Sequence, residues 1–528
     1  MSEIFELSRF ERAETHEPTV VLPFHPLEPK DNVAPMRRSK NGNAPAPPLQ
    51  LIQKLCEALN AQQISYCHWK SNYKLNRWLA GDGDLDLLVE RADSQRFTSI
   101  ISGLGFQQAE PHEDRRVPGV LHFYGLDKPT GCLVHLHVYY QLVFGDDLTE
   151  NYHLATENIY LETSARQGLM AIPSREAELI VFVLRNVLKH APVESWIRTA
   201  LGKQPNAVKQ QELEFLESGV DPVKLANLLS RLVPPVDTTL FNRCLQSLRP
   251  DTSLVARSWA KQQLRKRLST CERNPWMTDA LLKMQRRFAS LTGAFIVSSN
   301  SGKRLSEGGI LIALVGGDGS GKTTALQGLS SWLSTDFRTR RFHIGKPPRS
   351  LITFALIVML RLNRLLRSTL RRDQTPDVQE FPGYLQLLRW VSASRDRRRH
   401  YVTARRFATD GGIALCDRYP IKQFRLMDGP NIAHTVGSEY RNRFIKLLSH
   451  LERNNYRKIM PPDLLIVLRV NPDVAVERKT TEDEEHVRTR STEVWGVDWT
   501  GTNAHVIDAS QTASSVLSEV QSIIWGRL

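Results

Sequence analysis

Hydrophobic and polar positions alternate most regularly in the last two-fifths of the chain. Short apolar runs, bounded by turn residues and separated by segments of helical spacing, stand at 310–315, 342–344, 413–416, 464–468 and 505–507. Apolar strands that alternate with helices are typical of a parallel sheet covered by helices on both faces. The pattern therefore predicts an α/β fold here, a three-layer α/β/α domain over residues 306–528.

The earlier part of the chain has shorter patterns of both periods. Residues 51–59 have helical spacing, whereas 84–89 and 132–138 read as strands. These segments predict a smaller α/β domain over 49–165. From there to residue 305 the spacing is helical and no cluster of catalytic residue types stands out. We predict a helical linker domain over 166–305.

The beginning of the sequence lacks such patterns. Residues 1–48 contain eight prolines and end in a proline-rich run. This composition cannot bury enough apolar surface to offset the entropy of ordering, so it predicts a disordered leader, with a proline-rich docking arm as the alternative. The first 14 residues mix both charges and have no apolar core, so we expect no signal peptide.

Composition narrows the class of protein. The chain has 528 residues, of which 41% are hydrophobic and 24% charged, values typical of a globular protein with several domains. Its six cysteines are scattered without a CxxC pair, which fits a reducing compartment. No apolar run reaches 18 residues. We therefore expect a cytoplasmic protein without a disulfide scaffold or a membrane span.

The net charge of +14 is concentrated in one stretch. Residues 338–406 hold 17 basic and 4 acidic residues, nearly the whole excess. A local concentration favours a local anion, such as a nucleotide, a phosphosugar or a membrane surface, over a chain-wide nucleic-acid coat. We expect no specific nucleic acid as a partner.

Residues 351–372 form an unusual part of this basic stretch. An almost wholly apolar decapeptide is followed by Arg361, Arg364, Arg367 and Arg371 at helical spacing. Ten apolar residues cannot cross a bilayer. The segment predicts either a core helix with a solvated basic end or a peripheral contact with a membrane or a polyanion.

A glycine-rich motif follows the strand predicted at 310–315. It contains GxxxxGK[ST] within Gly316, Gly317, Asp318, Gly319, Ser320, Gly321, Lys322, Thr323 and Thr324. Glycines let backbone N–H groups turn inward around a β-phosphate, and the next helix adds its dipole. Lys322 is then placed to reach the β- and γ-phosphates and Thr323 to ligate Mg²⁺. The motif predicts a P-loop that binds ATP and Mg²⁺.

A second polar motif, Asp417-Arg418-Tyr419, follows the predicted strand 413–416. Open α/β sheets present their ligand-binding groups at the carboxyl ends of strands. We expect Asp417 to help hold the metal ion or its waters and Arg418 to face an anion.

With these motifs in order, residues 308–528 resemble the thymidylate kinase branch of the P-loop nucleoside monophosphate kinases. The resemblance rests on Asp318 in the third place of the P-loop, on Asp417-Arg418-Tyr419, and on Arg395 in the segment Ser392-Ala393-Ser394-Arg395. It implies that Arg395 and Arg418 lie near the acceptor phosphate and Asp318 near the acceptor's sugar hydroxyl.

The resemblance implies phosphoryl transfer from ATP to a nucleoside monophosphate such as dTMP or to another phosphorylated acceptor. The family also uses a basic lid, and Arg478, Lys479, Arg488 and Arg490 flank the polar segment where that lid belongs. We expect a catalytic lid role for Arg478 or Arg488, with a solvated basic face as the alternative. Family members often dimerise, so a homodimer stays open. A regulatory ATP-binding or ATPase module is the alternative function.

Two acids in the amino-terminal domain suggest a second centre. Asp84 and Asp86 stand at alternate positions of a strand and therefore point the same way. With His68-Trp69-Lys70-Ser71-Asn72 upstream, this segment resembles the nucleotidyltransferase superfamily, which implies Mg²⁺ on Asp84 and Asp86 and nucleotidyl transfer as an alternative activity. The superfamily's third carboxylate has no match, but His135 or His137 stands in its place and histidine still coordinates metals.

Overall fold

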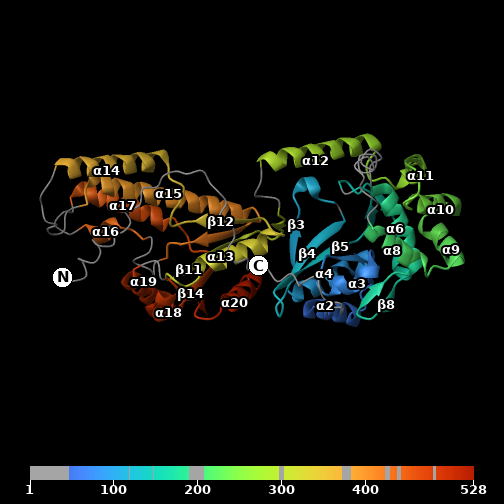
Figure 1. Ribbon diagram of the computed structural model, residues 1–528, viewed down its shortest axis with the longest axis horizontal. Coiled ribbons are helices and arrows are strands. Elements are labelled where there is room, and N and C mark those ends of the chain that lie inside the picture. The colour runs from blue at the N-terminus through green and yellow to red at the C-terminus, as the bar shows by residue number, and fades with distance from the viewer. Residues whose placement is uncertain are drawn as a thin grey trace.

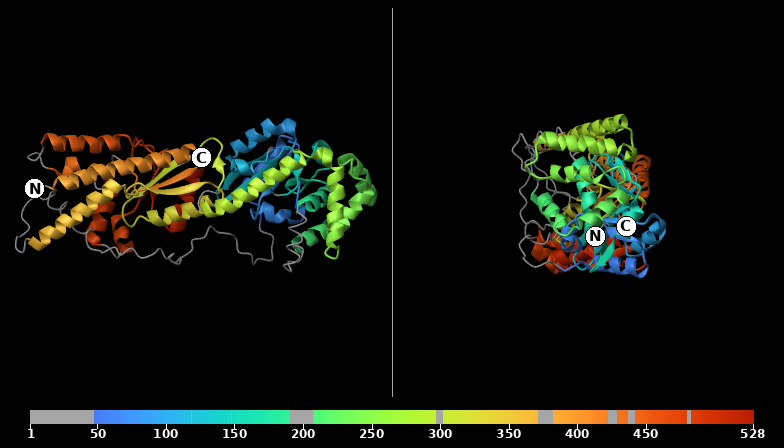
Figure 2. Two further views of the ribbon diagram at one scale, coloured as in Figure 1. Left: turned by 90° about the horizontal axis from the view of Figure 1, so that it is seen from above. Right: turned by 90° about the vertical axis from the view of Figure 1, so that its right-hand side faces the viewer.

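The computed structural model describes most of the chain after the predicted leader. The described residues are 47–528 apart from 118, 147, 190–206, 297–301, 371–381, 422–428, 437–441 and 480–482. Residues 1–46 of the leader therefore lie outside them. The molecule is elongated. Its two sheets lie next to each other near the middle, and helices extend toward both ends (Figures 1 and 2). None of the helices in the described part of the chain combines the length and hydrophobicity needed to cross a membrane.

The amino-terminal domain is built on a mixed sheet. Its elements are α2 (Gln50–Ala61), β1 (Tyr66–His68), α3 (Leu75–Leu79), β2 (Leu85–Val89), α4 (Ser94–Gly103), β3 (Gln107–Glu110), β4 (Val120–Asp127), β5 (Cys132–Tyr139), β6 (Leu142–Phe144), β7 (Tyr152–Leu154), α5 (Glu157–Glu162), β8 (Ala165–Gln167) and β9 (Met170–Ile172). The sheet order is β1-β2-β5-β4-β3-β10, where β10 is Arg304–Leu305, and only β2 and β5 run parallel.

The two faces of this sheet differ in chemistry. Leu85, Leu87 and Val138 share one buried cluster with apolar residues of α2 and α4. Because side chains alternate between faces, the intervening polar residues project from the opposite face. There the register pairs Asp86 with His137 and His137 with His122, in one row across three strands.

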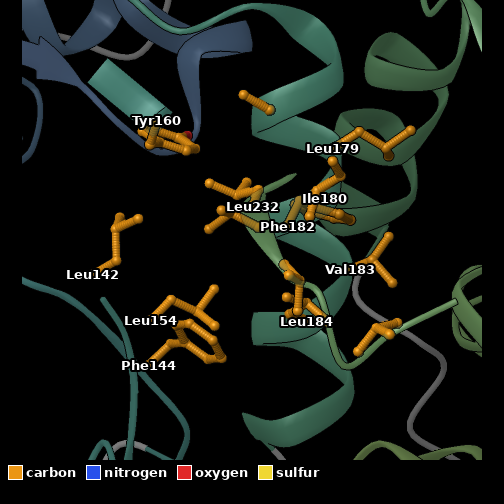
Figure 3. Close-up of a cluster of buried hydrophobic side chains, with 14 of the residues drawn as sticks. Leu142, Phe144, Leu154, Tyr160, Leu179, Ile180, Phe182, Val183, Leu184 and Leu232 are labelled. Atoms are coloured by element: carbon orange, nitrogen blue, oxygen red, sulfur yellow. The ribbon is translucent and has the colours of Figure 1, made fainter. Parts of the chain in front are cut away.

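Helices fill most of the described residues from 175 to 296, whereas the bounds of the predicted helical linker domain stay a prediction. The helices are α6 (Arg175–Lys189), α8 (Ala207–Glu217), α9 (Pro222–Leu232), α10 (Thr238–Ser247), α11 (Leu254–Arg267) and α12 (Trp276–Ile296). Figure 3 shows Ile180 and Leu184 of α6 in one buried cluster with Leu142 and Phe144 of β6 and Leu154 of β7. This core attaches the helical region to the amino-terminal domain.

The carboxy-terminal domain is the predicted α/β/α sandwich. Its elements are β10 (Arg304–Leu305), β11 (Ile310–Gly316), α13 (Lys322–Ser334), β12 (Thr339–His343), α14 (Leu351–Leu370), α15 (Tyr384–Thr409), β13 (Ile413–Asp417), α16 (Ile432–Thr435), α17 (Arg443–Arg457), β14 (Leu464–Arg469), α18 (Pro472–Arg478), α19 (Glu484–Gly496), β15 (Ala504–Asp508) and α20 (Ala513–Trp525). The strand order is β12-β13-β11-β14-β15, all parallel, which confirms the α/β fold class.

Alternation along β11 explains the layers. Ile312 and Leu314 pack with α13 and α20, whereas Leu311 and Ala313 pack with α15 on the other face. All seven residues of β11 are buried, so the strand carries apolar residues on both faces. The carboxyl ends of the parallel strands consequently meet at one edge of the sheet.

The two sheets are joined by a common core. β10 pairs with β3 of the amino-terminal sheet, and Leu305 also donates its N–H to the carbonyl of Gly411. Trp525 of α20 donates from Nε1 to the carbonyl oxygen of Gly105 at 3.0 Å. Phe337, just beyond α13, packs on the ring of Tyr124 of β4. Segments from both domains therefore bury one another's apolar surface.

Helix α14 packs on α15 through polar side chains. Asp396 of α15 is buried and accepts hydrogen bonds from Ser350 and Thr353 at the start of α14. The apolar residues Leu351 and Leu365 are 88% and 63% exposed. The interpretation of this segment as a core helix is therefore wrong for its described side chains, whereas the membrane or polyanion contact stays a prediction.

Candidate phosphate-binding site

The glycine-rich loop joins the buried end of β11 to the start of α13. Gly319 and Gly321 have φ of +75° and +78°, a left-handed backbone that favours glycine. A Cβ on Gly316 would stand 2.5 Å from the carbonyl oxygen of Leu468, and one on Gly319 would stand 2.6 Å from that of Ala475. The glycines are thus required by backbone conformation and by close approach, as a phosphate-cradling loop demands.

Lys322 folds over this loop. Its Nζ donates to the carbonyl oxygens of Gly316 at 2.9 Å and Gly317 at 2.6 Å. Burial lowers the pKa of the Lys322 ammonium to about 8, although the carboxylates of Asp318 and Asp417 act in the opposite direction. The ammonium group is therefore held at the rim of the loop and is still charged at neutral pH.

Asp318 is a buried acid within the loop. Its Oδ2 accepts from Arg490 of α19 at 2.8 Å, and Lys479 lies 3.9 Å from Oδ1. Burial alone would raise the pKa of Asp318, but the hydrogen bond from Arg490 and the nearby Lys322 and Lys479 outweigh burial and lower the pKa. Asp318 thereby ties the helix after the predicted lid to the loop.

The two arginines favoured for the lid have other contacts in this structure. Arg478 donates to the carbonyl oxygens of Ala509 at 2.7 Å and Ser510 at 3.1 Å, and so holds the loop after β15. Arg488 is half-exposed and pairs with Asp473. Their catalytic role stays a prediction, and the lid residues 480–482 lie outside the described residues. Arg490, two positions along the same helix, is the lid-flanking arginine that reaches the P-loop.

β13 brings the second motif beside the loop, because it is the direct neighbour of β11. Asp417 is paired in register with Leu314, and its Oδ1 is buried without a hydrogen-bond partner among the described residues. Thr323 is exposed in the first turn of α13. A carboxylate oxygen and a threonine hydroxyl are suitable ligands for Mg²⁺ or its waters. These residues fit the ion that the sequence predicts.

Arg418 has an unusual backbone for a residue with a side chain. Its φ is +48°, a conformation that costs about 1–3 kcal/mol outside glycine and that clusters at functional sites. Its charge acts on Lys322 and contributes to lowering that residue's pKa. The chain therefore places this arginine near the P-loop at an energetic cost.

Helix α15 contributes a basic face. Arg395 is partly buried and has no ion pair among the described residues. Arg397, which the sequence analysis did not single out, donates to the carbonyl oxygen of Gly345 at 3.0 Å. Gly345 lies in the loop after β12, at the same edge of the sheet as Asp417. The helical spacing of the basic residues alone could not show which arginine faces this loop.

The amino-terminal acids also lie in a polar cluster. Asp84 Oδ1 is 2.8 Å from His135 Nδ1, and Asp86 Oδ1 is 3.1 Å from His137 Nδ1. Lys70 contacts Asp86 at 2.8 Å. Burial alone would raise the pKa of Asp86, but Lys70 and His137 lower it. Mg²⁺ binding by Asp84 and Asp86 stays a prediction.

His122 belongs to this cluster and was missed from the sequence. It lies on β4, and its Nδ1 is 3.2 Å from His135 Nε2. Burial, with His137 nearby, lowers the pKa of His122 to about 2. The available signal was the turn at residues 128–131, which predicts a hairpin and would place His122 opposite His137.

Comparisons with known proteins find relatives and a solved structure that are similar to part of the chain. No protein-family model matches it. The chain is 25% identical over 221 residues to the uncharacterized ATP-binding protein YghR of Escherichia coli K12, covering 40% of this chain and 86% of that protein. It is 29% identical over 181 residues to YghS of the same strain, also named an uncharacterized ATP-binding protein, covering 32% and 73%.

Among solved structures, the chain matches a deoxyadenosine kinase from M. mycoides with bound dATP. The match covers 41% of this chain and 99% of that one at 16% identity, with a TM-score of 0.25. At this score the likeness supports no statement about function. The parallel sheet and the glycine-rich loop nevertheless define the class of the carboxy-terminal domain, an α/β domain with a P-loop.

Proposed function

We propose that the carboxy-terminal domain transfers the γ-phosphoryl group of ATP to a phosphorylated acceptor. The observation that carries this proposal is the position of Asp417 at the end of β13, directly beside the P-loop that follows β11. Lys322 reaches across the loop, and the next strand presents a buried carboxylate oxygen without a hydrogen-bond partner among the described residues. The names of the ATP-binding relatives YghR and YghS also support ATP as the nucleotide.

The proposed roles follow from charge and position. Main-chain N–H groups of the loop and Lys322 bind the β- and γ-phosphates, and Thr323 and Asp417 hold Mg²⁺ or its waters. When bound, Mg²⁺ neutralises charge on the phosphate oxygens. An acceptor oxygen attacks the γ-phosphorus, and the bond to the β–γ bridging oxygen breaks as ADP leaves. Such transfer depends mainly on positioning and electrostatic stabilisation, which the charged groups around the loop can provide.

The basic groups point to an anionic acceptor. Arg418 lies beside the P-loop, and Arg397 reaches the loop after β12. Arg395 lies on the same helix as Arg397. A phosphate on the acceptor would be stabilised by these guanidinium groups. We infer a phosphorylated acceptor, with a thymidylate-like nucleoside monophosphate as the first candidate.

The test is acceptor dependence. Purified protein is incubated with γ-labelled ATP, Mg²⁺ and a panel of nucleoside monophosphates and sugar phosphates, and transfer of label is measured. We expect label to move to one class of acceptor and Lys322→Ala to reduce the rate at least about a hundredfold. Lys446→Ala, at an exposed lysine of α17, is the matched control and should retain the rate.

Two other results would contradict the kinase proposal. ATP hydrolysis that no acceptor accelerates would instead support a regulatory ATPase module. Release of pyrophosphate that survives Lys322→Ala and is lost in Asp86→Ala would move the chemistry to the amino-terminal domain and support nucleotidyl transfer there.

A further inference from the structure

Three histidines converge on the polar face of the amino-terminal sheet. β4 contributes His122 and β5 contributes His135 and His137. One ring nitrogen of each lies within 4.8 Å of the other two. This cluster is independent of the P-loop and has no part in the proposed phosphoryl transfer.

Two carboxylates determine which nitrogen two of the rings offer. His135 Nδ1 faces Asp84 at 2.8 Å, and His137 Nδ1 faces Asp86 at 3.1 Å. An ionised carboxylate can only accept a hydrogen bond, so each Nδ1 carries a proton and each Nε2 presents a lone pair. Both rings are thus held in the tautomer that a metal ion requires.

Two of the ring nitrogens have a separation suited to one ion, which would replace the hydrogen bond that joins them. His135 Nε2 lies 3.2 Å from His122 Nδ1. Two nitrogens that each lie about 2.1 Å from a tetrahedral metal ion are about 3.4 Å apart. One ring nitrogen of His137 lies within 4.8 Å of the ligand nitrogens of the other two histidines, so it can complete the same site. Histidines that bind metals commonly donate their other N–H to a carboxylate, as His135 and His137 do here.

We propose that His122, His135 and His137 bind one divalent transition-metal ion of the Zn²⁺ class. Asp84 and Asp86 act as positioning residues that hold two of the rings. Imidazole nitrogen is a ligand for Zn²⁺ and its neighbours in the transition series, whereas Mg²⁺ prefers oxygen. The ammonium of Lys70 also neutralises Asp86 at 2.8 Å, which disfavours an additional hard cation on that carboxylate.

Asp84 leaves the site open on one side. Its side chain is 48% exposed, and its Oδ2 lies 3.9 Å from His137 Nε2. The ion can therefore enter from solvent, and Asp84 or a water molecule can supply a fourth ligand.

The test measures metal binding by the full chain without a polyhistidine tag. Protein is stripped with a chelator and titrated with Co²⁺, whose visible absorption reports coordination, and Zn²⁺ is then added in competition. We expect one ion per chain. His122→Gln should weaken binding at least about tenfold, and the double variant His122→Gln/His135→Gln should abolish it. The control His450→Gln, at an exposed histidine of α17, should bind as the wild type does.

Asp86→Asn separates ligation from positioning. It retains all three ring nitrogens but removes the carboxylate that holds His137, so we expect affinity to fall about tenfold to a hundredfold while one ion per chain remains at saturation. Thermal melts monitored by circular dichroism identify variants that fail to fold. If the histidine variants fail to fold, Asp86→Asn provides the test. The proposal is overturned if wild-type protein binds neither Co²⁺ nor Zn²⁺, if the double variant binds as the wild type does, or if Mg²⁺ competes equally with Zn²⁺.

Discussion

The P-loop and the histidine cluster are built in opposite ways. The P-loop uses the main chain of consecutive residues, 316–324, and its shape depends on glycines with a left-handed backbone. The histidine cluster uses side chains of β4 and β5, and Asp84 and Asp86 at β2 hold two of its rings. Only the sheet register brings these three strands together. A site made of main-chain groups depends on local conformation, whereas a site made of side chains depends on long-range pairing.

One helix lies between the two regions. α13 begins at Lys322 in the P-loop and ends before Asp336. Asp336 accepts a hydrogen bond from Tyr124 at 3.2 Å, and the Tyr124 ring stacks on His135 with a centroid separation of 4.2 Å. The two regions are therefore connected through α13, Asp336 and Tyr124, but they share no ligand group.

The largest expected effect tests the main-chain character of the P-loop. Gly319→Ala would place a side chain at a φ of +75° and 2.6 Å from the carbonyl oxygen of Ala475. The strain of about 1–3 kcal/mol should lower Mg²⁺-dependent ATP affinity about tenfold to a hundredfold, measured by calorimetry.

Gly496→Ala is the control for this substitution, because a Cβ there meets nothing within 4 Å. It should leave ATP affinity unchanged. Zn²⁺ binding by Gly319→Ala should also match the wild type. Equal ATP affinities for the two glycine variants would contradict the role given to the loop backbone.

An effect of intermediate size is expected for the pH dependence of ATP affinity. The pKa of Lys322 is about 8 in the free protein, and a bound triphosphate favours the charged ammonium. Below pH 8 this group already carries its proton, whereas above pH 8 binding must take one up. ATP affinity should therefore fall about tenfold between pH 7 and pH 9.

Lys322→Arg provides the comparison for this profile, because arginine stays charged over the whole range. Whatever its absolute affinity, its profile should be nearly flat between pH 7 and pH 9. A wild-type profile as flat as that of the variant would show that Lys322 does not set the pH dependence.

The smallest expected effect compares two arginines of α19. Arg490 contacts the buried Asp318, whereas Arg488 pairs with Asp473 at the surface. Arg490→Ala should lower ATP affinity about fivefold, because it removes a partly buried charge pair at the loop. Arg488→Ala should change affinity less than about twofold, since exposed pairs contribute little. The reverse order would favour Arg488, one of the two lid residues predicted from the sequence, over Arg490.

The sequence could predict the features that depend on local segments, but not those that depend on long-range packing. The strands of the carboxy-terminal sheet, the P-loop and Asp417 all lie in short segments whose apolar pattern or motif is complete in itself. Arg490 could not be separated from Arg488, because both flank the lid and only packing decides which one turns inward. Similarly, His122 is separated from His137 by a hairpin, and its position depends on strand register.

The apolar segment of α14 shows a different limit. Its hydrophobic pattern predicts burial as readily as it predicts a surface contact. In the structure, buried polar contacts of Asp396 with Ser350 and Thr353 hold the start of the helix against α15. These contacts join residues far apart in sequence, so the pattern of the helix alone could not reveal them.

Equilibrium binding of ATP to the wild type and to Lys322→Ala tests the central claim most directly. Titration calorimetry with and without Mg²⁺ should show one ATP per wild-type chain, with affinity that requires Mg²⁺ and falls at least about tenfold in the variant. Binding of neither ATP nor GTP by the folded wild-type protein, or equal affinities for the two proteins, would contradict it.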